Sequence, residues 1–144
     1  MKKINILLFF TLVLLIGVNC RREKDNCHKT ITFINKTEGT LYVTSAYEYP
    51  DTMVFRTEPN PILNPNFTKV LPKENNTQVL WSRDCIELAF KDLIPSDTLM
   101  IYVFAGQVLN TTPWDIVKAN HLVLKRYDLS LEDLQKLDWT ITYP

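Results

Sequence analysis

The chain has 144 residues, with 16 basic and 16 acidic side chains and therefore a formal net charge of zero. This length suits one compact domain, and the balanced charge lacks the basic patch that nucleic-acid binding needs. There are only three glycines, and none of them stands in a glycine-rich phosphate-binding motif. Composition thus argues against a nucleic-acid partner and against a glycine-loop nucleotide site.

The first residues follow the order of a secretory signal peptide. Lys2 and Lys3 precede an almost wholly apolar stretch at 4–16, which is shorter than the roughly 20 residues that cross a bilayer. The polar break Gly17-Val18-Asn19-Cys20 follows. A cysteine closing the apolar run resembles the lipobox of bacterial lipoproteins, with Asn19 where a small residue is usual. The alternatives are an uncleaved anchor helix and a buried core helix.

That resemblance implies cleavage before Cys20 and acylation of its thiol, so that the chain reaches the membrane through an N-terminal lipid. We expect a signal peptide at 1–19, a lipidated tether at 20–27 and a single β-rich domain at 28–144. Two or more acyl chains anchor a protein stably, at about 0.8 kcal/mol for each buried methylene. The leader holds two basic residues and no acidic one, so the remaining chain carries a net charge of −2.

Lipidation of Cys20 leaves Cys27 and Cys85 as an even pair of cysteines. In an exported protein such a pair predicts a disulfide, because the compartment is oxidising. A zinc site that includes His28 is the alternative, although the sequence has neither a C-x-x-C nor an H-x-x-x-H motif. We therefore expect a disulfide that ties the start of the domain to its middle, and no metal or other cofactor.

Short strands dominate the elements predicted after residue 28, because β-branched and aromatic residues recur with polar–apolar alternation. Prolines restrict the stretch at 47–65 to an edge strand near 53–55. Strands are predicted, in chain order, at 30–33 and 40–46, joined as a hairpin, and at 67–71, 78–81, 98–105, 121–127 and 139–143. Helices are predicted at 86–93, where a strand is the alternative, at 112–120, and after a capping box formed by Ser130 and Asp133.

The fold class that these elements predict is mainly β: an antiparallel β-sandwich-like domain with two or three short helices. An α+β fold is the alternative. The apolar stretch at 98–105 is expected to be a central strand, since both of its faces are apolar.

One resemblance is carried by the segments 31–35, 41–43, 49–52, 97–104, 114–115, 124–127, 129, 133–134 and 139–144. On these segments, much of the chain after Cys20 resembles a group of small uncharacterised lipoproteins of Bacteroides-type bacteria. The resemblance implies an outer-membrane lipoprotein of the cell envelope, facing either the periplasm or the cell surface. That group has no established activity, so it assigns no catalytic residues.

Two threonines fall in a pattern that resembles the acceptor of the general O-glycosylation system in such bacteria, an Asp followed by Ser or Thr and an apolar residue. They are Thr52 and Thr98. The alternative is that the aspartate ends a turn before a strand, and we prefer it for Thr98. Asn35 begins one of several N-x-T tripeptides, a pattern that belongs mainly to eukaryotic secretion.

No motif for catalysis is found: the sequence has no G-x-S-x-G, and its two histidines fall in separate predicted elements. Tyr47 and Tyr49 are candidates for a surface aromatic site that binds a glycan or an envelope protein, although aromatic residues in small β domains more often fill the core. The sequence thus predicts a binding, accessory or structural module of the envelope that is not an enzyme. An envelope hydrolase with an unrecognised site is the alternative.

Overall fold

The computed structural model describes residues 27–50, 59–80 and 82–144. The predictions for the leader, Cys20, Thr52, the edge strand at 53–55 and Trp81 lie outside these residues. Within them, no helix is both long enough and apolar enough to span a membrane.

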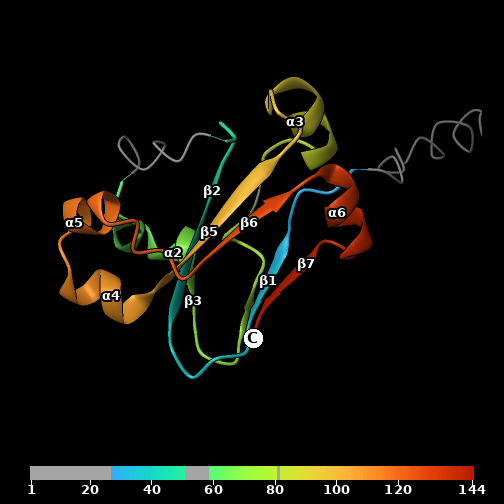
Figure 1. The fold of residues 1–144 in the computed structure, drawn as a ribbon. Coiled ribbons are helices and arrows are strands. Elements are labelled where there is room, and N and C mark those ends of the chain that lie inside the picture. The colour runs from blue at the N-terminus through green and yellow to red at the C-terminus, as the bar shows by residue number, and fades with distance from the viewer. Residues whose placement is uncertain (1–26, 51–58, 81) are drawn as a thin grey trace, which may run out of the picture.

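Two β-sheets form the body of the domain (Figure 1). Most of the strands are four to seven residues long, and two are single pairs of residues. The smaller sheet has the order β4 (Asn75–Asn76), β1 (Thr32–Asn35), β7 (Thr140–Tyr143), and the larger has the order β3 (Lys69–Val70), β2 (Leu41–Ala46), β5 (Leu99–Ala105), β6 (Lys125–Leu129).

The predicted two-sheet, β-rich class is confirmed, and its strand pairing differs from the prediction in two respects. β1 and β7 are parallel, with Thr32 opposite Thr140, whereas an antiparallel arrangement was expected throughout. The predicted hairpin of β1 with β2 is wrong, because β4 and β7 occupy the two edges of β1. The connection after Asn35 therefore passes from one sheet to the other instead of folding back.

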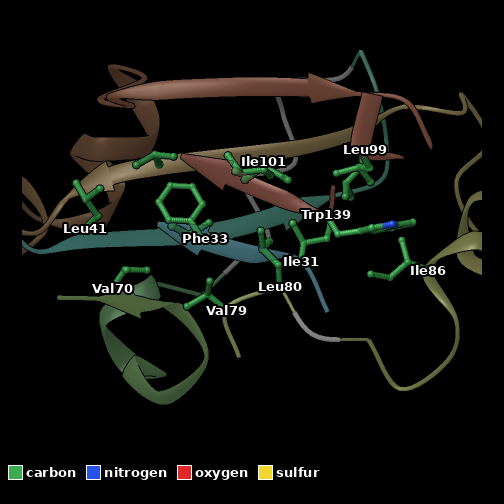
Figure 2. Packing of buried hydrophobic residues seen from close by; sticks show 14 of the residues in the cluster. Ile31, Phe33, Leu41, Val70, Val79, Leu80, Ile86, Leu99, Ile101 and Trp139 are labelled. Atoms are coloured by element: carbon green, nitrogen blue, oxygen red, sulfur yellow. The ribbon is translucent and has the colours of Figure 1, made fainter. Parts of the chain in front are cut away.

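The main core lies between the sheets, and Figure 2 shows part of it. Phe33 and Ile141 enter from the smaller sheet, and Val43 and Ile101 enter from the larger one. A second cluster covers the other face of the larger sheet, where Phe104 and its neighbours meet the short helices. β5 is therefore buried on both faces, as its apolar sequence predicts.

Short helices connect the strands, and there are more of them than the two or three predicted. The predictions of α3, α5 and α6 are confirmed. At α6, Ser130 Oγ accepts from the Asp133 N–H at 3.1 Å, and Asp133 Oδ2 accepts from the Ser130 N–H at 3.0 Å. The helices are η2 (Pro61–Leu63), α2 (Pro65–Thr68), α3 (Ile86–Asp92), α4 (Gly106–Thr111), α5 (Trp114–Ala119) and α6 (Leu131–Lys136).

The predicted disulfide is present: Cys27 is bonded to Cys85, immediately before α3. His28, which follows Cys27 in the chain, holds the same end of the domain in place. Its backbone N–H donates to Glu87 Oε2 at 2.9 Å, its Nδ1 lies 2.6 Å from Glu87 Oε1, and its ring stacks on Trp139 at 4.0 Å between centroids. We call this the entry end of the domain; β1 and β7 both begin there.

Candidate binding groove

A groove of about 590 Å³ opens at the opposite end from Cys27, where β1, β5 and β7 end and β2 begins. The C-terminus lies at this end in Figure 1. The lining residues come from the β1–β2 connection, the adjoining strand ends and α4. They are Thr37, Gly39, Thr40, Leu41, Ala105, Gly106, Gln107, Asn110, Thr111, Leu124 and Tyr143.

The wall formed by the β1–β2 connection is held by Asn35, whose side chain is fully buried. Its Oδ1 accepts from the Thr37 N–H at 2.9 Å and from the Thr37 hydroxyl at 2.8 Å. Its Nδ2 donates to the carbonyls of Gly39 at 2.7 Å and Leu71 at 3.0 Å. A buried amide with this many partners fixes a single course for the loop. It is also withdrawn from any modification at its N-x-T tripeptide.

Gly106 sets the close approach of α4 to the same connection. Its N–H donates to the Thr40 carbonyl at 2.8 Å, and a Cβ on Gly106 would lie 2.8 Å from that oxygen. No side chain fits there without movement of the backbone. At Gly39, by contrast, the nearest atom to an added Cβ is Thr37 Oγ1 at 3.9 Å.

The groove offers uncharged polar groups above an apolar base. Leu41 is buried at its base, Leu124 is exposed and Tyr143 is half-buried. The Thr111 hydroxyl donates to the Gln107 carbonyl at 2.9 Å. Within the described part of the chain, the structure gives the side-chain amides of Gln107 and Asn110 no hydrogen-bond partner. These amides can therefore donate to and accept from a ligand.

Groups with a shifted pKa lie outside the groove lining. Burial by itself would raise the pKa of Glu87, but hydrogen bonds from His28 outweigh burial and lower it. Hydrogen bonds from Ser130 lower the pKa of Asp133, and the hydrogen-bonded carboxylate of Asp128 raises the pKa of Arg126. Burial raises the pKa of Tyr127. These shifts follow from ion pairs, a helix cap and packing, so they mark structural contacts.

Tyr47 and Tyr49 are 40% and 38% exposed, and they have different neighbours. Tyr47 borders a small cavity of about 60 Å³ that also contacts Ile86 of α3, which is room for no more than a few water molecules. Tyr49 lies against Arg126, whose guanidinium carbon is 5.9 Å from the ring centroid. Neither ring lines the groove, and a surface aromatic site at Tyr47 and Tyr49 stays a prediction.

The remaining candidates are placed as follows. Thr98 is half-buried, its hydroxyl donates to the Ser96 carbonyl at 3.1 Å, and the preceding Asp97 has a φ of 51°. Asp97 and Thr98 therefore form the turn before a strand, which is the alternative that we prefer for this site.

The disulfide uses the thiols that the zinc alternative required. Among the described residues, no group of three or more His, Cys, Asp or Glu side chains could hold a metal ion.

Comparison of the chain with protein-family models, with curated proteins and with solved structures gives no match.

The residues that shape the groove were not predicted as functional from the sequence. In the sequence, Asn35 looks like an ordinary turn residue. Its buried side chain donates a hydrogen bond to the carbonyl of Leu71, a residue that is distant in the sequence. Gly106 directly follows a buried strand, and a glycine at such a position is a local signal of a close backbone approach. Gln107 belongs to no binding motif, and Asn110 begins only one of the N-x-T tripeptides. Their shared face could not be predicted, because α4 itself was not predicted.

Proposed function

We propose that this protein is a lipoprotein of the bacterial cell envelope, anchored in the outer membrane through acylated Cys20, and that its domain is a binding or accessory module. The observation that carries the proposal is the placement of the groove at the opposite end from the entry end. A domain held by its entry end presents the groove to the surrounding solution.

The length of the tether supports this orientation. Cys27 follows Cys20 by seven residues, which span at most about 25 Å when fully extended. The entry end therefore stays near the bilayer if Cys20 is lipidated. The groove then faces soluble or surface-bound partners.

The disulfide supports export, since disulfides persist in oxidising compartments such as the periplasm and the cell surface and are rare in the cytosol. The order of charged, apolar and polar residues before Cys20 is an independent sequence argument for the same route. Binding is favoured over hydrolysis because, among the residues that the structure describes, the groove lining contains no carboxylate, imidazole or thiol side chain. These are the groups that serve most often in acid–base and nucleophilic catalysis.

Incorporation of labelled palmitate in the expressing bacterium tests the anchor. We expect label on the wild-type protein and none on Cys20→Ala. The double variant Cys27→Ala/Cys85→Ala is the matched control and should keep the label, because it lacks two cysteines but retains Cys20. Absence of label from the wild-type protein would overturn the proposed anchor.

A further inference from the structure

We infer that the groove binds a neutral oligosaccharide, which deepens the binding role proposed above and rests on it. The uncharged lining is the first step of the argument. Within the described ranges 27–50, 59–80 and 82–144, no Lys, Arg, Asp, Glu or His lines the groove, so a charged ligand would lose its hydration without gaining a counter-charge there. Beside the β1–β2 connection, Glu38 is paired with Lys73: Lys73 Nζ lies 2.9 Å from Glu38 Oε1 and also donates to the Lys36 carbonyl at 2.7 Å.

The polar groups of α4 supply the second step. Gln107 and Asn110 are three residues apart, so they lie on one face of the helix, and both border the groove. Each primary amide offers two donors and an acceptor in one plane. Adjacent hydroxyls of a sugar ring each donate and accept, which complements such amides.

The base of the groove supplies the third step. A sugar ring is amphipathic, with hydroxyls at its edge and C–H groups on its face. The exposed side chain of Leu124 and the half-buried Tyr143 give those C–H groups an apolar surface, and the buried Leu41 lies at the base. The volume of about 590 Å³ is within the usual range for ligand sites, roughly 300 to 1,000 Å³.

The same groove is less suited to binding an extended peptide. Extended peptides commonly gain affinity by adding a strand to a free sheet edge. The groove lies at strand ends and against a helix face, so its walls present no ladder of free backbone groups. Neutral glycans are therefore the ligand class that the lining fits best.

The test is a binding screen on the full chain, purified in a detergent without a sugar headgroup, against labelled neutral and acidic oligosaccharides and neutral peptides. We expect binding of a neutral glycan with little dependence on salt, because no ion pair forms. The variant Gln107→Leu/Asn110→Leu should weaken this binding by about tenfold or more, since two amides that pair with the ligand are lost. Gln135→Leu, an exposed amide on α6 away from the groove, is the matched control and should bind as the wild type does.

A second variant covers the case in which Gln107→Leu/Asn110→Leu does not fold. Asn110→Asp keeps the size of the side chain but removes its donors and adds a charge, so it should also lose affinity for the neutral glycan. The inference is overturned if no neutral glycan binds, if acidic glycans or peptides bind instead, or if the amide variants bind like the wild type. The palmitate experiment is independent of this outcome, so a failure of the ligand class is distinguishable from a failure of the anchor.

Discussion

Two glycines that border the same groove have different structural requirements, and this difference can be tested. Gly106→Ala places a methyl group 2.8 Å from the Thr40 carbonyl oxygen. The backbone must shift and the hydrogen bond between them must lengthen, so we expect a loss of about 1–3 kcal/mol in the free energy of unfolding. The methyl group of Gly39→Ala makes only an ordinary van der Waals contact, 3.9 Å from Thr37 Oγ1, and should change stability by less than about 1 kcal/mol, in the stabilising direction. Urea denaturation of both variants measures the difference; equal effects would contradict the close approach at Gly106.

At the scale of single residues, Asn35 shows why the groove is harder to predict than the core. The core positions Phe33 and Ile141 follow from polar–apolar alternation within their own strands. The role of Asn35 depends on carbonyls at Gly39 and Leu71, of which the second is brought near only by the fold. A polar residue in a turn has the same local sequence whether it is exposed or buried.

At the scale of elements, the contact between His28 and α3 makes stability depend on pH. The pKa of Glu87 is lower in the folded protein than its ordinary value of 4.5, so the unfolded chain takes up a proton first as the pH falls. The contribution of Glu87 is therefore present above about pH 4.5 and is lost as the pH falls through the lower folded pKa.

The variant Glu87→Gln removes this titration, and we expect its stability to fall less steeply than that of the wild type between about pH 5 and pH 3. Urea denaturation across that range is the measurement. Asp133→Asn should act in the same direction, because the Ser130 hydrogen bonds also lower the pKa of Asp133. Identical pH profiles for Glu87→Gln and the wild type would show that the contact with His28 does not stabilise the carboxylate.

Elements with a strong local signal were predicted, and those that depend on distant pairing were not. The capping box of α6 and the apolar run of β5 are encoded within a few residues, and both are confirmed. β4 is a pair of exposed or half-buried asparagines that is a strand only because β1 lies beside it. The helix α4 was missed because it begins directly where β5 ends, without a side-chain cap.

At the scale of the whole molecule, the parallel pairing of β1 with β7 could not be predicted, because it joins the two ends of the described domain. It also accounts for the position of the groove, since both strands point away from the entry end and finish beside α4. From the sequence, the segment near Cys27 was predicted only as part of a disulfide, and the segment at 139–143 was predicted only as the last strand. Their relation in space required the structure.

The disulfide should make a large contribution to the stability of the whole domain. It closes a loop between residues 58 positions apart, and the chain-entropy argument gives about 4 kcal/mol for a loop of that length. We expect Cys27→Ala/Cys85→Ala, or reduction of the wild type, to lower the free energy of unfolding by about this amount in urea denaturation. Reducing agent should have no further effect on the double variant, which serves as the control. If the wild type unfolds at the same urea concentration with and without reductant, and mass measurement shows two free thiols after reduction, the covalent link does not stabilise the domain. Non-covalent contacts, among them those of His28 with Glu87, Ile86 and Trp139, then hold the entry end.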